Sequence, residues 1–315
     1  MNPAASSDRS HKTVVVIVGD GRSGSTIVDM VLGELSDAVS VGELRFFWQR
    51  GLKLNQLCGC GEKFLECPFW TSVREPIELE IDRETKNTLL EIENYGSLTR
   101  YPLERIRSAW SVERSNYHKT LIEAYDRVYD EVFKVSKKNV IIDSSKSVYF
   151  AFFLQKYSRH DLKFLHVIRD SRAVAFSKQK YKERKEIHTH KEMMPKMGVL
   201  KSSFKWLIVN WLSAGIGNSS ARMLVRYEDF ALSPIEVVTK IARFLKLDPS
   251  AVQSLFDRDG KISMVEHHTI SGNPSRFTNG PVKIESDDQW KVDTPPWRKA
   301  VINVISLPGL YRFYR

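Results

Sequence analysis

Residues 13–26 read TVVVIVGDGRSGST, and IVDMVLGEL follows at residues 27–35. The β-branched run Thr13–Val18 predicts a short strand that is buried on both faces. A glycine-rich turn ends this strand, and the apolar residues after the turn have helical spacing. Strand, glycine-rich turn and helix in this order are typical of the start of an α/β nucleotide-binding domain.

The turn itself, residues 19–26, almost fits the phosphate-loop template G-x-x-x-x-G-K-[ST]. Glycines let backbone N–H groups close around an anion, and the N-terminus of the next helix adds partial positive charge. Ser25 stands where nucleotide triphosphatases have a lysine that reaches the β- and γ-phosphates, which argues against triphosphate chemistry. Arg22 can supply the missing charge. The sequence thus predicts an anion site formed by Gly21, Arg22, Ser23, Gly24, Ser25 and Thr26.

Four further apolar segments predict strands, at residues 39–41, 139–142, 162–168 and 223–227. Helical patterns separate them, and strands that alternate with helices imply a parallel sheet with crossover helices. Residues 44–57 are predicted to be helical. Residues 82–138 also look mainly helical, and we interpret them as an insertion or lid. We expect one domain over residues 1–315, with a flexible N-terminus at 1–12 and a mobile charged loop at 182–196.

The composition of the 315 residues is that of an ordinary globular protein, which argues against a disordered, collagen-like or repeat protein. The net charge of +10 favours a polyanionic partner such as nucleic acid, an anionic membrane face or a phosphate-rich cofactor. No apolar run reaches the 18 residues of a membrane span, and the N-terminus lacks the apolar segment of a signal peptide. We therefore expect a cytoplasmic enzyme.

The stretch GRSGST at residues 21–26 resembles the sulfotransferase family, whose first loop holds the 5′-phosphosulfate of 3′-phosphoadenosine-5′-phosphosulfate. The segment LHVIRDSRAVAFS at residues 165–177 is similar to the second signature of that family. There, an arginine at a strand end and a serine eight residues later contact the 3′-phosphate, and Arg169 and Ser177 match both. A forked guanidinium and a hydroxyl suit a dianionic phosphate. Without the family, Arg169 would be a surface residue paired with Asp170.

A third similarity is the turn SGNPSRF at residues 271–277, because bacterial sulfotransferases have similar segments that fold over the adenine and the 3′-phosphate. Gly272 and Arg276 thereby become candidate cofactor contacts. The resemblance extends from Val14 to about Phe277 and is to the bacterial type of the family. It implies a P-loop-kinase-like three-layer α/β domain. The helical insertion at 82–138 has no counterpart that we recognise in the family, and we interpret it as shaping the acceptor site.

Sulfuryl transfer needs a base for the acceptor hydroxyl, cations on the sulfuryl oxygens and a donor to the bridging oxygen. Glu43, which follows a strand and Gly42, resembles the base of tyrosylprotein sulfotransferases; otherwise it would complement a helix dipole. Lys146 matches the lysine that contacts the bridging oxygen in the same relatives. With Arg22 and Arg169 it would neutralise charge, so that no metal is required. His268 is an alternative base, whereas Ser144 and Ser145 lack a hydrolase nucleophile motif.

Three cysteines, Cys58, Cys60 and Cys67, stand in CGCG and CPFW segments. They could bind zinc, but a tetrahedral site needs a fourth ligand, and no histidine lies between His11 and His118. A disulfide within the trio and plain packing are the alternatives. We expect no catalytic metal at these cysteines, and their role stays open.

The predicted reaction is transfer of a sulfuryl group to an acceptor hydroxyl, with adenosine 3′,5′-bisphosphate as the product. No residue selects among small molecules, sugars, lipids and peptides as the acceptor, and the oligomeric state is open. Two alternatives come from other classes. A nucleotide-dependent kinase would need the lysine that Ser25 replaces, and a nucleic-acid-binding protein would need basic residues clustered with aromatics, which are scattered here. We expect no nucleic-acid partner.

Overall fold

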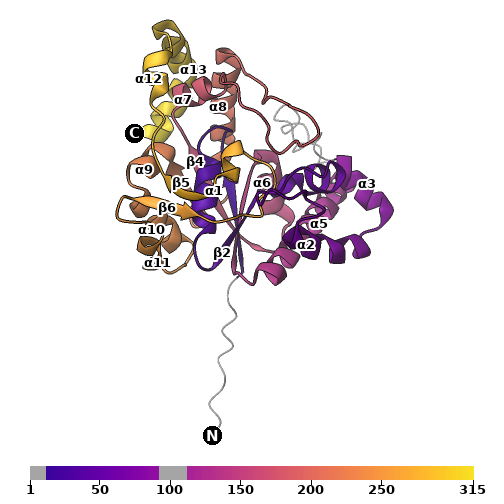
Figure 1. The fold of residues 1–315 in the computed structure, drawn as a ribbon. Coiled ribbons are helices and arrows are strands. Elements are labelled where there is room, and N and C mark those ends of the chain that lie inside the picture. Colours follow the sequence, from indigo (N-terminus) through magenta and orange to yellow (C-terminus); the bar gives the residue numbers. More distant parts are fainter. Residues whose placement is uncertain (1–11, 92–111) are drawn as a thin grey trace.

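A five-stranded parallel sheet forms the centre of the molecule in this computed structural model, which describes residues 12–91 and 112–315 (Figure 1). The strand order is β2–β3–β1–β4–β5, and every neighbouring pair is parallel. The strands are β1 (Thr13–Val18), β2 (Ala38–Gly42), β3 (Val140–Lys146), β4 (Asp161–Ile168) and β5 (Arg222–Arg226). The predicted α/β fold with a central parallel sheet is confirmed.

Helices cover both faces of this sheet. Val14 and Val16 of β1 pack into a core with α2 (Pro68–Glu80), α5 (Val112–Ser136) and α6 (Val148–Tyr157). Val15 and Ile17 face the opposite way and pack with α1 (Ser25–Gly33) and α10 (Pro234–Phe244). Figure 1 shows α2 and α5 on one side of the molecule and α10 on the other. Because side chains of a strand alternate, one buried valine-rich strand holds two helical layers together, and the three-layer expectation is confirmed.

Several elements were not predicted from the sequence. β6 (Lys261–Met264) and β7 (Gly280–Lys283) form an antiparallel pair, and η4 (Pro274–Phe277) is a short 3₁₀ helix between them. The C-terminal helix α13 (Pro296–Tyr314) packs against α7 (Ser171–Ser177) and α8 (Val199–Ser213). The remaining helices are α3 (Arg83–Glu91), α9 (Tyr227–Leu232), α11 (Ala251–Ser254) and α12 (Gln289–Asp293).

The helix predicted over residues 44–57 is not a regular α-helix. A 3₁₀ helix, η1 (Leu44–Phe46), leads into a π-helix, η2 (Phe47–Lys53). Phe46, Phe47 and Trp48 are all fully buried here, and a regular amphipathic helix does not direct three consecutive side chains into one core. The changed winding satisfies this demand.

Two other predicted segments are the helical insertion at 82–138 and the charged loop at 182–196. The predicted helical insertion contains α3 and α5, but residues 92–111 lie outside the described part of the chain, as do residues 1–11. Residues 182–196 form a loop whose ends are joined by a bridge between Glu183 and Met193. Among the described residues, no helix is long and apolar enough to cross a lipid bilayer.

One buried side chain in the sheet makes the stability of the fold depend on pH. His166 of β4 is 1% exposed, and its Nε2 lies 3.0 Å from Oδ1 of Asn210 on α8. Burial lowers the pKa of His166 from 6.5 to about 4. Between pH 6.5 and pH 4, His166 is therefore protonated in the unfolded chain but stays neutral in the folded chain. This contribution to stability is fully present above pH 6.5 and is lost as the pH falls towards 4.

We expect the wild type to lose about 2 kcal/mol of unfolding free energy relative to His166→Gln between pH 6.5 and pH 5. Glutamine keeps an N–H donor for Asn210 and does not titrate. Urea unfolding of both proteins at several pH values measures the difference, and the exposed His190→Gln serves as control. Parallel pH profiles for wild type and His166→Gln would contradict the assignment.

Candidate functional site

The glycine-rich turn between β1 and α1, residues 19–26, is called the phosphate-like loop below because it resembles the phosphate-loop template. It has the backbone conformation that its glycines predict. Gly19 and Gly24 have φ of 138° and 83°, and Arg22 also lies in the left-handed region with φ of 73°. Gly24 precedes α1, and no side chain caps the first N–H groups of this helix. The open helix N-terminus and the left-handed turns form the kind of backbone concavity that binds anions.

Two buried donors of this loop have no hydrogen-bond partner among the described residues: Nη1 of Arg22 and Oγ of Ser23. The second terminal nitrogen of Arg22, Nη2, lies 2.7 Å from Sδ of Met194, which belongs to the 182–196 loop. Buried polar groups are nearly always paired in native proteins. Orphaned donors at a helix N-terminus fit a ligand that accepts hydrogen bonds there.

A buried ion pair ties this loop to the end of α7, and it was not predicted from the sequence. Lys178 follows Ser177 directly, is 7% exposed and forms an ion pair with Asp20, which is 1% exposed. Nζ of Lys205 on α8 lies 3.9 Å from the same carboxylate. Burial lowers the pKa of Lys178, and the carboxylate of Asp20 opposes this shift. Only the folded chain brings Asp20 and Lys178 together, because 157 residues separate them.

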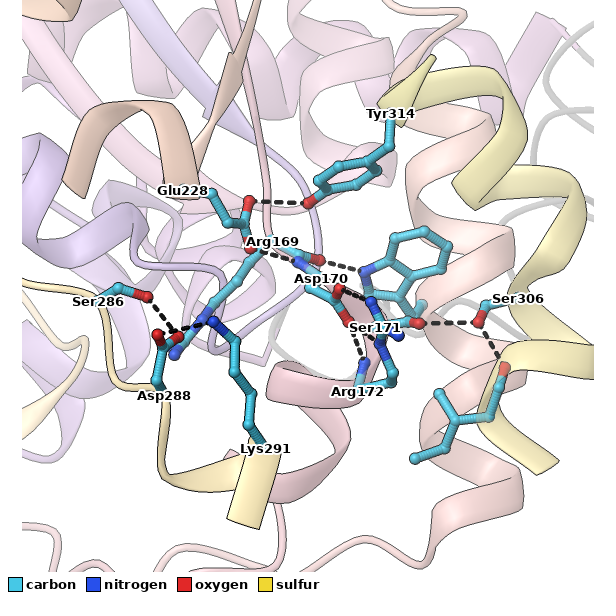
Figure 2. Close-up of polar contacts among 12 residues, drawn as sticks. Arg169, Asp170, Ser171, Arg172, Glu228, Ser286, Asp288, Lys291, Ser306 and Tyr314 are labelled. Atoms are coloured by element: carbon cyan, nitrogen blue, oxygen red, sulfur yellow. Dashed lines mark hydrogen bonds and ion pairs between the residues drawn. The ribbon is translucent and has the colours of Figure 1, made fainter. Parts of the chain in front are cut away.

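Arg169 and Ser177 lie where the second signature predicts them, at the end of β4 and on α7. Both are 8% exposed. The guanidinium of Arg169 packs 4.9 Å from the ring centre of Tyr227, and Nη2 donates to the main-chain oxygen of Asp287 at 3.1 Å. Figure 2 shows that Arg169 points away from Asp170, which pairs with Arg172 instead. The surface pair with Asp170 that we had considered for Arg169 is therefore excluded.

The main chain around Arg169 is held by a dense set of contacts, drawn in Figure 2. Nε1 of the buried Trp206 donates to the oxygen of Arg169 at 2.8 Å, and the N–H of Asp170 donates to Glu228 at 2.8 Å. Asp170 also caps α7 by accepting from the N–H of Arg172. These contacts fix the strand end, so the side chain of Arg169 is positioned before any ligand arrives.

Glu43 and Lys146 form an ion pair at the ends of β2 and β3, with Nζ 2.7 Å from Oε1. Their side chains are only 11% and 14% exposed. Burial by itself would raise the pKa of Glu43, but the charges of Lys146, Arg45 and Arg50 outweigh it and hold the pKa below its usual value of 4.5. Glu43 is therefore ionised at neutral pH and has a neighbouring cation.

The late loop, residues 266–277, brings Gly272 beside this ion pair. The N–H of Glu43 donates to the oxygen of Ile270 at 2.7 Å, so the loop continues alongside the end of β2. A side chain at Gly272 would lie 3.7 Å from Oε1 of Glu43 and 3.8 Å from Oγ1 of Thr26. Gly272 thus sits between the phosphate-like loop and Glu43, where its φ of 113° also favours glycine.

Arg276 of the same loop is 1% exposed and has partners within the chain. Its Nη2 donates to the oxygen of Leu57 at 2.6 Å, and Nη1 donates to the oxygen of Thr269. Burial lowers the pKa of Arg276 to about 10. The side chain thus links the late loop to the cysteine segment, residues 57–70, which contains all three cysteines. Its guanidinium is occupied by main-chain oxygens and is not exposed towards a cofactor.

His268 does not join the strand ends. Its Nδ1 lies 3.3 Å from Sγ of Cys67 and 3.9 Å from Sγ of Cys58, and its ring stacks on Phe69. With Cys60, these residues place four potential metal-ligand atoms within 4.8 Å of one another. No fourth ligand lies near the cysteines in the sequence, as expected, but the fold brings a candidate, His268, from 201 residues further along the chain.

The phosphate-like loop, an ionised carboxylate and several cations thus lie together at the ends of β1, β2, β3 and β4. Parallel strands present their carboxyl ends at one edge of the sheet, which is why residues so far apart meet. The sequence analysis missed Lys178, Arg45 and Arg50 at this edge. It also missed Lys182, whose pKa is lowered by burial and then by Arg22, Lys180 and Arg169. These charged residues belong to no recognisable sequence motif, so the sequence does not identify them as site residues.

A separate hollow of about 390 Å³ lies between α6, α8 and α13, lined among others by Phe152, Trp211 and Arg312. None of the predicted site residues lines it. The strand-end arrangement therefore remains the candidate site.

Comparison with known proteins identifies the family and supports the fold. The sequence profile described as "Sulfotransferase domain" matches residues 12–278. Among solved structures, the sulfotransferase domain from the curacin biosynthetic pathway is similar with a TM-score of 0.52 and 14% identity, over 95% of this chain and 97% of that one. The sulfotransferase domain from the Synechococcus PCC 7002 olefin synthase has a TM-score of 0.50 and 15% identity, over 94% and 95%. At such identities the structures support the fold, and no curated protein matches the chain.

Proposed function

From the premise that this chain belongs to the sulfotransferase domain family, we propose that it moves a sulfuryl group from 3′-phosphoadenosine-5′-phosphosulfate to an acceptor hydroxyl. Membership of the family makes the chain a sulfotransferase, with the P-loop-kinase-like fold. We further propose which donor it uses, which residue acts as the base, and that the acceptor group is a hydroxyl.

The observation that carries the proposal is the Glu43–Lys146 ion pair beside the phosphate-like loop. Gly272 lies close to Glu43 and to Thr26 of that loop, so one small region offers a base, a cation and an anion site. These are the three aids that in-line sulfuryl transfer needs.

Residues of the chain fit the two phosphate ends of the donor. The orphaned donors of Arg22 and Ser23, with the backbone of Gly21, Gly24, Ser25 and Thr26, would hold the 5′-phosphosulfate. Arg169 and Ser177 would hold the 3′-phosphate. Arg276 contacts main-chain oxygens here, so we assign it to positioning the late loop, while Gly272 borders the donor.

The donor supplies an activated sulfuryl group. Glu43 accepts the proton of the acceptor hydroxyl as its oxygen forms the new bond to sulfur and the bond from sulfur to the bridging oxygen breaks. Lys146 donates a hydrogen bond to the bridging oxygen, which keeps the bonding electrons and leaves on adenosine 3′,5′-bisphosphate. Because its cationic neighbours make Glu43 a weak base, it depends on a hydroxyl that is held close and well oriented.

Glu43 is a better candidate for the base than His268. Nδ1 of His268 faces two thiols, and its ring is stacked on Phe69, whereas Glu43 lies at the strand ends. Residues 82–138 are proposed to shape the acceptor site. The predicted cytoplasmic location and the single-domain assignment stay predictions.

Labelled 3′-phosphoadenosine-5′-phosphosulfate, incubated with the full chain and a panel of hydroxylated sugars, lipids, phenols and peptides, tests the function directly. Transfer of label to one class supports the proposal and names the acceptor class. ATP with Mg²⁺ is the matched alternative donor. Stabilisation by ATP with Mg²⁺ that exceeds stabilisation by adenosine 3′,5′-bisphosphate would favour the kinase alternative instead.

Arg169→Ala is expected to weaken binding of adenosine 3′,5′-bisphosphate by about 2 kcal/mol or more, which is roughly 30-fold. The reason is the loss of charge-assisted hydrogen bonds from a guanidinium that the fold already holds in place. Isothermal calorimetry measures the change. Arg172→Ala is the matched control, because its guanidinium pairs with Asp170 on the same helix and should matter far less. Equal affinities for wild type and Arg169→Ala would remove Arg169 from the site.

A further inference from the structure

We propose that Cys58, Cys60, Cys67 and His268 together bind one structural zinc ion. The ion would take no part in the transfer reaction. Its four ligand side chains lie together in the fold but come from two distant parts of the chain.

Three of the distances among the ligand atoms are close to the edges of a zinc tetrahedron, and all four atoms lie within 4.8 Å of one another. Zinc binds sulfur at about 2.3 Å and histidine nitrogen at about 2.0–2.1 Å, so a regular site has S···S edges of about 3.8 Å and S···N edges of about 3.6 Å. Sγ of Cys60 and Sγ of Cys67 are 3.7 Å apart. Nδ1 of His268 lies 3.3 Å and 3.9 Å from the sulfurs of Cys67 and Cys58. Small adjustments of these side chains would place all four atoms around one ion.

A disulfide fits these positions less well. The sulfurs of Cys60 and Cys67 are 3.7 Å apart, whereas a disulfide bond is about 2.05 Å long. All three cysteines are free. A disulfide between any two of them would not explain why the third thiol and the histidine lie beside the pair. A Cys₃His set is, in contrast, a complete ligand set for structural zinc.

The CPFW segment, residues 67–70, orients the histidine. Cys67 precedes the first turn of α2, and Pro68 begins that helix. The ring of Phe69 stacks on the ring of His268, with centroids 4.9 Å apart and an interplanar angle of 4°. Nε1 of Trp70 donates to the main-chain oxygen of His268 at 2.8 Å. Neighbours that fix a ligand's orientation are typical of metal sites, and they give this segment a role that its sequence did not reveal.

The CGCG segment, residues 58–61, is shaped for a close approach to the same histidine. A side chain at Gly59 would lie 2.4 Å from the oxygen of His267 and 2.5 Å from Oγ1 of Thr269. The N–H of Gly59 donates to the oxygen of Thr269 at 3.0 Å, and Gly61, with φ of 91°, closes the turn. The main chain on either side of His268 is therefore docked on the loop that carries Cys58 and Cys60.

Charge balance also agrees with a zinc ion. Three thiolates and one Zn²⁺ leave a net charge of about −1. The buried Arg276 donates to the oxygens of Leu57 and Thr269, which directly adjoin the ligands Cys58 and His268. A buried cation that braces both ligand segments can compensate this charge.

Four protein ligands leave no open position, so the proposed ion is structural. It would clamp the late loop onto the cysteine segment. The other side of this loop carries Ile270 and Gly272, which contact or adjoin Glu43. The ion would thus hold one wall of the candidate site without touching the reacting atoms.

Metal analysis of the full chain, purified with reductant and without added chelator, tests the proposal. We expect about one zinc per chain and, after exchange with Co²⁺, the intense visible spectrum of a tetrahedral thiolate site. Because the chain has only three cysteines, thiol titration reads this site alone, and zinc should protect all three. Sub-stoichiometric zinc after growth with added zinc, or an intact mass that shows a disulfide in the reduced preparation, would overturn the proposal.

His268→Asn and Cys60→Ser are expected to lower zinc affinity at least tenfold and to reduce the melting temperature. His190→Asn is the matched control, since His190 is exposed and lies elsewhere, and it should keep the wild-type zinc content. Should the ligand variants fail to fold, Co²⁺ spectra of the wild-type chain still decide the question. Full zinc content in folded His268→Asn would remove His268 from the site.

Discussion

Glu43→Gln is expected to reduce turnover at least about a hundredfold while the affinity for adenosine 3′,5′-bisphosphate stays nearly unchanged. The substitution keeps the size of the side chain and removes its ability to take a proton. The residues proposed to hold the two phosphate ends of the donor, Arg22, Ser23, Arg169 and Ser177 among them, are not those that pair with this carboxylate. Steady-state transfer assays and calorimetry on the same preparations separate the two effects.

Glu236→Gln is the matched control, because Glu236 is an exposed residue of α10 that pairs with Lys240 and not with a residue of the candidate site. It should behave like the wild type in both assays. Wild-type turnover in Glu43→Gln would remove Glu43 as the base. If His268→Ala were then inactive yet still bound both cofactor and zinc, His268 would take its place.

Lys146→Met is expected to lower turnover by a similar factor, on the order of a hundredfold, with a modest loss of donor affinity. The variant removes the hydrogen bond to the bridging oxygen. It also leaves the buried carboxylate of Glu43 without its nearest cation, 2.7 Å away in the wild type. Lys240→Met on the surface is the matched control.

The pH dependence separates the two roles of Lys146. In the wild type, the pKa of Glu43 lies below 4.5, so its base form persists from neutral pH down to about that value. In Lys146→Met, burial is less well opposed, the pKa of Glu43 rises, and the acid limb of the turnover profile should move to higher pH. Lys146→Arg restores the charge and should return this limb towards its wild-type position. An acid limb that is identical in wild type and Lys146→Met would show that the ion pair does not set the protonation of Glu43.

Much of the candidate site could be predicted because its parts are local. Glycine spacing in residues 19–26 and the valine-rich strand before them depend on neighbours a few residues apart, and the structure has the predicted strand, turn and helix. Arg169 and Glu43 each follow a strand directly. Once the strands are known to be parallel, their ends meet at one edge.

The missed features depend on contacts between distant residues. In the sequence, nothing distinguishes Lys178 from other basic residues. Its burial against Asp20 appears only in the folded chain. Residues 44–57 have a helical pattern, but the burial of Phe46, Phe47 and Trp48 changes the winding. The partners of Arg276 are likewise main-chain oxygens, at residues 57 and 269, and no local sequence motif predicts these contacts.

The α/β class, the phosphate-like loop and the family resemblance follow from local sequence patterns, because β-branching, glycine spacing and hydrophobic period act within one element at a time. The surroundings of the three cysteines, in contrast, depend on contacts that form only in the folded chain. Their fourth partner, His268, is 201 residues from Cys67, and the two meet because the late loop docks beside the end of β2. Which of several distant histidines arrives there depends on the packing of the whole chain.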